Sequence, residues 1–142
     1  MYNFRKSKKG FTLIELMVVV AIIAVLALLG LRVYSTQQNK AKEAIVKANA
    51  GTVQVQIQTA LVDTSLSDVA TALEIEDLNA LQNPFTNLSG VANTVQADTS
   101  STTILANGEG FVGVHLSDKI FVISGYGKDG KIIPYYTLTA QR

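Results

Sequence analysis

The hydrophobic pattern begins with an apolar run over residues 11–31 that contains one charged side chain, Glu15. As a helix, this run would be about 32 Å long, which is enough to cross the hydrocarbon core of a bilayer. A carboxylate within such a segment is disfavoured, and where one is kept it usually has an electrostatic partner. The pattern therefore predicts a membrane-spanning helix over residues 11–31 and makes Glu15 a candidate functional residue.

Beyond residue 31 the pattern becomes amphipathic and stays so to residue 62. Small and apolar residues recur there at the three- and four-residue spacing of a helix face. A first stripe consists of Ala41, Ala44, Ile45, Ala48, Thr52, Val55, Thr59 and Val62. A second stripe consists of Val46, Ala50, Val53, Ile57 and Leu61. We predict an amphipathic helix over residues 32–62 that covers a sheet with part of its surface.

One segment of this region also has the pattern of a β-strand. Residues 52–59 alternate strictly between polar and apolar, follow Gly51 and are rich in β-branched side chains. Local pattern alone favours a strand there. Because the helical spacing continues through the segment without a break, we predict one helix over residues 11–62.

The middle of the chain, residues 63–101, is expected to be a connector with one or two short helices, and Ser67 is a candidate N-cap. Residues 83–87 read Asn-Pro-Phe-Thr-Asn and predict a turn, because proline fixes φ. The stretch 88–101 is rich in Ser, Thr, Asn and Ala, which indicates a surface loop with a short edge strand at 91–95.

Residues 102–142 have the clearest β pattern. Four strands are predicted, at residues 102–106, 111–116, 119–124 and 132–139. Asn107-Gly108 and Asp129-Gly130 are hairpin signals, because both central residues of a type I′ turn need positive φ. Residues 125–127 suggest a bulge, and Pro134 suggests an edge strand. The predicted fold class is α+β, with a long N-terminal helix packed on an antiparallel meander of about four strands.

Composition and charge narrow the choice of function. The chain has 142 residues, room for one modest domain, and no cysteine, so it forms neither a disulfide nor a thiolate metal site. Four of its 12 basic residues precede residue 11 and none of its 11 acidic ones does, which leaves a formal charge of −3 after Gly10. The remaining basic residues are scattered, so no nucleic-acid interface is evident.

The basic N-terminal segment must be classified before the fold is considered. A removable secretory signal would have a shorter apolar core and a small-residue cleavage pattern after it, and neither is present. The run Lys-Lys-Gly-Phe-Thr-Leu-Ile-Glu-Leu at residues 8–16 instead resembles the class III signal of type IV pilins and type II secretion pseudopilins. The basic cluster also predicts that the N-terminal end is cytoplasmic.

This resemblance implies roles for four residues. Prepilin peptidase would cut between Gly10 and Phe11, remove residues 1–10 as a leader and methylate the new N-terminus at Phe11. Glu15 of one subunit would then meet the N-terminal amine of its neighbour, because a charge in a low-dielectric filament core needs a partner. Tyr34 resembles a tyrosine that packs between subunits, although a lone aromatic at a membrane boundary is an equally good interpretation.

The implied function is that of a structural subunit of a type IV pilus, a homopolymer held together without covalent bonds. Its implied partners are prepilin peptidase, an inner-membrane assembly platform with its ATPase, and the cytoplasmic membrane before assembly. The first alternative is the major pseudopilin of a type II secretion or competence pseudopilus. The second is a membrane-anchored binding module that never polymerises.

The candidate chemistry beyond the N-terminus is sparse. His115 lies close in sequence to Ser117 and Asp118, but residues on one strand and turn cannot supply triad geometry. Glu74, Glu76 and Asp77 lack the ligand spacing of a calcium loop. The 126–131 turn resembles that of calcium-binding major pseudopilins, but its single carboxylate is flanked by two lysines. We therefore expect no catalytic residue, no metal and no cofactor.

Overall fold

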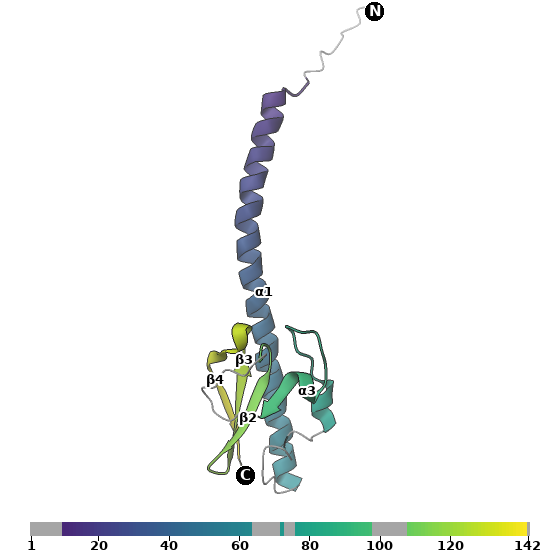
Figure 1. The fold of residues 1–142 in the computed structure, drawn as a ribbon, viewed down its shortest axis with the longest axis vertical. Helices are drawn as coiled ribbons and strands as arrows, with labels where there is room; N and C mark the ends of the chain where they lie inside the picture. The colour runs from purple at the N-terminus through teal and green to yellow at the C-terminus, as the bar shows by residue number, and fades with distance from the viewer. Residues whose placement is uncertain (1–9, 64–71, 73–75, 98–107, 142) are drawn as a thin grey trace, which may run out of the picture. The chain divides into compact units, whose positions relative to one another are not determined.

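The computed structural model describes residues 10–63, 72, 76–97 and 108–141. The chain divides into two compact units, with the boundary between Gln37 and Gln38. One helix, α1 (Leu13–Asp63, 51 residues), contributes to both units (Figure 1). The expected long N-terminal helix is confirmed.

The first unit contains the apolar part of α1. Every described residue from Gly10 to Gln38 is exposed, and the large apolar side chains between Leu13 and Leu31 are 48–77% exposed. Within the described residues, α1 is long and apolar enough to cross a membrane. Among the described residues of the unit, nothing covers these side chains.

The second unit has a core between the C-terminal part of α1 and a sheet. The second stripe predicted from the sequence is the buried one: Val46, Ala50, Val53, Ile57 and Leu61 belong to the core cluster. On the sheet side, the cluster includes Val112, Val114, Phe121 and Ile123. The first stripe remains outside the core, and Ile45, Val55 and Val62 are 47%, 62% and 76% exposed.

The segment that also resembled a strand, residues 52–59, is helical. Two of the polar residues in its alternating pattern are glutamines that bind the end of the last strand. Gln54 Nε2 donates to the carbonyl oxygen of Thr139 at 2.8 Å, and Gln58 Nε2 donates to that of Gln141 at 2.9 Å. Two glutamines one helical turn apart thus bind alternate residues at the end of the last strand.

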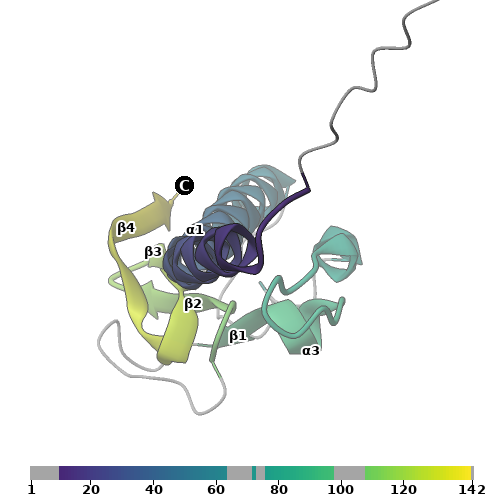
Figure 2. The same cartoon turned by 90° about the horizontal axis from the view of Figure 1, so that it is seen from above.

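The sheet has four strands in the order β1-β2-β3-β4 (Figure 2). Their bounds are Val95–Ala97, Val112–Ser117, Ile120–Tyr126 and Ile132–Ala140. β2, β3 and β4 form the expected antiparallel meander. β1 is not one of the four strands of the predicted meander, and it runs parallel to β2. The strand predicted at residues 102–106 lies outside the described residues.

The turns agree with the sequence in part. Asp129 and Gly130 both have positive φ, 65° and 64°, as the Asp-Gly signal predicts. The β2–β3 turn has the same property at Asp118 and Lys119, with φ of 48° and 70°, although neither is glycine. The register shifts between Ser124 and Tyr126, which confirms the bulge at residues 125–127. Pro134 lies in β4, an outer strand, as expected.

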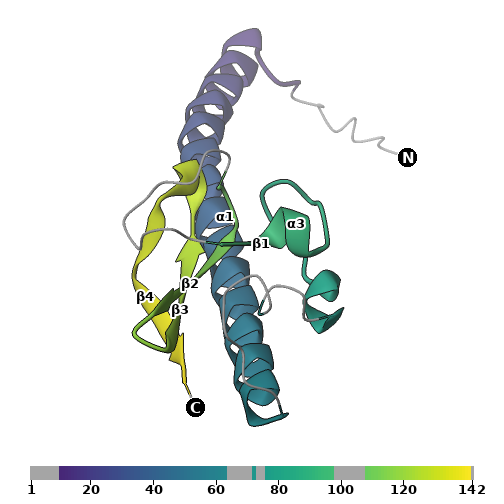
Figure 3. The same ribbon diagram turned by 60° about the horizontal axis from the view of Figure 1, so that its bottom comes forward.

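The described part of the connector contains a 3₁₀ helix, η1 (Glu76–Ala80), and a short helix, α3 (Val91–Thr94). α3 replaces most of the edge strand predicted at residues 91–95, and the chain becomes extended only at β1. Figure 3 shows α3 beside β1, on the opposite side of the sheet from β4. The candidate N-cap Ser67 lies outside the described residues.

Asn83 holds this connector together. Its side chain is fully buried; Nδ2 donates to the carbonyl oxygens of Asn93 at 3.0 Å and Glu109 at 2.9 Å. Its Oδ1 accepts from the backbone N–H of Phe85 at 2.9 Å and of Thr86 at 3.3 Å. The predicted turn at residues 83–87 is thus stabilised by an asparagine that also binds the segment leading into β2.

Candidate functional site

The candidate site lies at the start of α1, where the chain enters the helix. Thr12 directly precedes the first helical residue, Leu13, and Glu15 is in the first turn. The Thr12 N–H donates to Glu15 Oε2 at 2.8 Å, and the Glu15 N–H donates to Thr12 Oγ1 at 3.3 Å. This reciprocal arrangement is a capping box, which satisfies two N–H groups that have no partner within the helix.

A third hydrogen bond strengthens the box. The Thr12 hydroxyl donates to the same Glu15 oxygen, Oε2, at 2.8 Å. Glu15 Oε2 therefore accepts both from the backbone and from the side chain of Thr12. The carboxylate is also at the N-terminal end of α1, where the helix dipole favours a negative charge.

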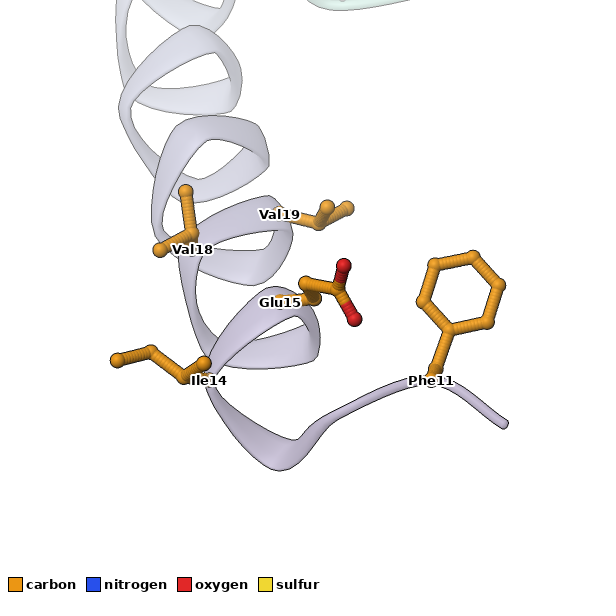
Figure 4. A pocket seen from close by; sticks show the side chains of 5 residues that line it. All are labelled: Phe11, Ile14, Glu15, Val18 and Val19. Carbon is orange, nitrogen blue, oxygen red and sulfur yellow. The ribbon is translucent and has the colours of Figure 1, made fainter. Parts of the chain in front are cut away.

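The surroundings of the carboxylate are apolar. A shallow hollow is lined by Phe11, Ile14, Glu15, Val18 and Val19, and Figure 4 shows the carboxylate on the same side of the first turn as the Phe11 ring. Phe11 itself is 89% exposed. The hollow thus offers one charged group, with apolar side chains on either side of it.

The other residues singled out from the sequence are placed as follows. Gly10 and Phe11 are exposed and precede the helix, and a Cβ built at Gly10 would meet nothing within 4 Å. Tyr34 is 65% exposed on α1. It is 19 residues after Glu15, so about 28 Å along the helix separates the two. The structure groups Gly10, Phe11 and Glu15 at one end of α1, and Tyr34 is apart from them.

The second unit brings together no catalytic group among the residues considered. His115 in β2 is half-buried, and its Nδ1 has no hydrogen-bond partner among the described atoms. Its cross-strand partner is Val122, and Ser117 and Asp118 are exposed beyond it on the strand and turn. In the described part of the chain, no three His, Asp or Glu side chains lie close enough to hold a metal ion.

The role of Thr12 was not predicted from the sequence, although its signal is present there. A threonine followed three residues later by a glutamate, directly before an apolar run, is the pattern of a capping box. Asn83 was likewise assigned to a turn, and its contacts with Asn93 and Glu109 come from residues too distant in sequence to be predicted.

Comparison with known proteins identifies the segment that contains this site. Residues 5–31 match the prokaryotic N-terminal methylation motif. The chain carries this motif. It covers the basic segment, the proposed cleavage position, Thr12, Glu15 and the whole apolar run, and it ends where the run ends. The methylation motif thus includes the exposed apolar part of α1 and residues 10–12, which directly precede the helix.

The relatives found for the chain are type IV fimbrial proteins. It is 39% identical over 61 residues to the type IV major fimbrial protein FimA of Dichelobacter nodosus, which is 43% of this chain and 38% of that protein. It is 37% identical over 89 residues to the fimbrial protein EcpB of Eikenella corrodens, which is 57% of this chain and 56% of the relative. The chain thus matches about two fifths to somewhat over half of these relatives' length. No solved structure is a significant match.

Proposed function

We propose that the protein is a structural subunit of a type IV pilus and that it polymerises through α1. The observation that carries this proposal is the exposure of every large apolar side chain between Leu13 and Leu31 in a helix that carries the methylation motif. An apolar surface of this extent needs lipid or protein around it. Lipid would surround it before assembly, and the helices of other subunits would surround it in the filament. The similarity to fimbrial proteins supports this proposal.

Processing is part of the proposal. Prepilin peptidase cleaves the Gly10–Phe11 bond and the new amine of Phe11 is methylated. The chain at these two residues is exposed and lies outside the helix, which supports this proposal because a peptidase needs an accessible peptide bond. Removal of residues 1–10 takes away four basic side chains and leaves the apolar part of α1 with Glu15 and one amine. The precursor is a single-pass protein of the cytoplasmic membrane, and the processed chain is exported into the filament by the assembly platform and its ATPase.

Glu15 is proposed to pair with the Phe11 amine of a neighbouring subunit. A carboxylate and an ammonium in an apolar filament core stabilise one another, whereas either alone carries a large desolvation penalty. The pairing therefore favours one axial offset between neighbouring helices. Tyr34, at a distance along α1, is proposed to pack between subunits.

Replacement of Glu15 tests the polymerisation proposal. The variant Glu15→Ala should insert in the membrane and be cleaved, yet the filament yield in sheared surface fractions should fall at least about tenfold, because an unpaired amine is left in the core. The matched control Val18→Ala changes an uncharged side chain that lines the same hollow and should assemble. Intact mass of the sheared protein checks processing, with a chain that begins at methylated Phe11 expected. Normal filaments from Glu15→Ala would contradict the proposal and favour a non-polymerising membrane-anchored module.

A second candidate is the major pseudopilin of a type II secretion or competence pseudopilus. The feature that favours it is the Tyr126–Lys131 turn, where Asp129 and Gly130 both have positive φ, together with the absence of cysteine. The fimbrial relatives favour the pilus. Electron microscopy of cells that produce the protein separates the two: long surface fibres that contain the protein support the pilus, and its confinement to the cell envelope supports the pseudopilus.

A further inference from the structure

The two carboxylate oxygens of Glu15 differ in their hydrogen bonds. Oε2 accepts two hydrogen bonds from Thr12, whereas no donor among the described residues reaches Oε1. The oxygens of a carboxylate can together accept about four hydrogen bonds. Oε1 is therefore available to a group from outside the chain, and the direction in which it points is set by the bonds that Oε2 makes.

Two of the bonds between Thr12 and Glu15 hold the Glu15 carboxylate against its own helix, and the third holds the Thr12 hydroxyl in place. A glutamate side chain otherwise samples several rotamers, and ordering it on binding opposes association. The capping box orders the Glu15 side chain in the isolated subunit, before any partner binds. The N–H that Thr12 contributes belongs to the peptide bond between Phe11 and Thr12, so cleavage at the preceding Gly10–Phe11 bond leaves all three hydrogen bonds possible.

We propose that Thr12 is a positioning residue for Glu15: its hydroxyl and N–H hold Oε2, so that Oε1 is presented to the amine of the neighbouring subunit. This inference rests on the proposed function, because it adds a positioning residue to the same pairing. The Thr12 hydroxyl thus orients the Glu15 carboxylate in addition to capping the start of the helix. While the apolar part of α1 is in lipid, the same bonds give the carboxylate partners before the amine arrives.

Two substitutions at Thr12 separate the effect of the hydroxyl on assembly from the effect of the side chain's shape. Thr12→Val has nearly the same volume and branching but no hydroxyl, whereas Thr12→Ser keeps the hydroxyl and loses the methyl group. The proposal predicts that Thr12→Ser assembles within about twofold of the unmodified protein. Filament yield from Thr12→Val should fall about tenfold, because the hydroxyl's hydrogen bond to the carboxylate and the hydrogen bond that it accepts from the Glu15 N–H are lost. If packing alone mattered, Thr12→Val would assemble and Thr12→Ser would not, and that result would overturn the proposal, as would normal assembly of both variants.

A second measurement applies if Thr12→Val also impairs cleavage. Amide hydrogen exchange of the full chain in lipid nanodiscs reports on the capping box without assembly. Exchange of the backbone N–H groups at positions 12 and 15 should become about fivefold faster in Thr12→Val and stay unchanged in Thr12→Ser. Equal exchange in all three proteins would overturn the proposal. If Glu15→Ala abolishes filaments but neither Thr12 variant differs from the unmodified protein, only this inference fails; if Glu15→Ala assembles, the proposed function fails.

Discussion

At the scale of single residues, Asn83 makes more contacts than its place in a turn would suggest. Its amide donates twice and accepts twice, and it joins three parts of the second unit: the turn itself, the residue before the end of α3, and the segment that leads into β2. Gly110 lies directly against it, with φ of 77°; a Cβ there would collide with Asn83 Oδ1 and lie 2.8 Å from the Phe85 ring. Glycine is required at this position both for its conformation and for the space.

Asn83→Ala should be strongly destabilising. The change leaves two carbonyl groups and two N–H groups without their partner in a buried place, so we expect the free energy of unfolding to fall by about 3 kcal/mol. Urea unfolding of the full chain in detergent, followed by circular dichroism, measures it. Asn93→Ala is the matched control: its half-buried side chain donates one hydrogen bond, to the carbonyl oxygen of Ser89, and the loss of this bond should cost less than about 1 kcal/mol. Equal effects of the two changes would contradict the role given to Asn83.

At the scale of elements, α1 presents two apolar stripes that have different surroundings. The stripe with Val53 packs on the sheet, and the stripe with Val55 is left outside the core. Two further bonds attach this part of α1 to the rest of the second unit: Tyr136 Oη donates to the carbonyl oxygen of Lys47 at 2.6 Å, and Asn49 Nδ2 donates to that of Gln82 at 2.9 Å. The sheet and the connector are thus both attached to one helix.

The two stripes predict different responses to the same substitution. Val53 is fully buried, so Val53→Ala should lower the free energy of unfolding by about 2 kcal/mol through lost apolar burial and a small cavity. Val55 is 62% exposed, and Val55→Ala should change the free energy of unfolding by less than about 0.5 kcal/mol. Chemical unfolding of both variants gives the comparison. A larger loss for Val55→Ala than for Val53→Ala would mean that the helix face is assigned incorrectly.

Many features of these elements could be predicted from the sequence, because they depend on residues that are neighbours in the chain. The helix through residues 52–59 follows from spacing that continues across it, and the Asp129–Gly130 turn follows from two residue types that tolerate positive φ. The parallel pairing of Val95 with Val112 could not be predicted, since nothing near Val95 in sequence specifies the direction of its neighbour. Glu15 is evident in the sequence as the one charge in the apolar run, whereas its bonds with Thr12 depend on side-chain conformations that only the structure shows.

At the scale of the whole molecule, the two units differ in what surrounds their apolar residues. The unit that begins at Gln38 has its own core, whereas the described residues before Gln38 are exposed throughout. A protein with this division has one part that can be stable in water and one part that needs lipid or other helices. The boundary at Gln37 and Gln38 follows the end of the methylation motif by six residues.

A fragment of residues 38–142 should therefore fold without detergent. We expect a monomer with mixed helix and sheet content and one cooperative unfolding transition, because the core residues from Val46 to Ala140 all lie within it. Circular dichroism and size-exclusion chromatography check this. The full chain should need detergent or lipid under the same conditions. Aggregation of the fragment, or its lack of a cooperative transition, would contradict the division into two units.

The bonds from Gln54 and Gln58 to Thr139 and Gln141 have a consequence for solubility. β4 is an outer strand, and unpaired backbone groups on such a strand are a template on which another chain can add a strand and aggregate. Side-chain amides from α1 bind the carbonyl group of Thr139 in this strand and that of Gln141 directly after it, and Pro134 removes one N–H from the same strand. Neighbouring copies of the chain are therefore discouraged from joining edge to edge at this strand. In the proposed filament, contacts between sheets would then not compete with contacts between helices.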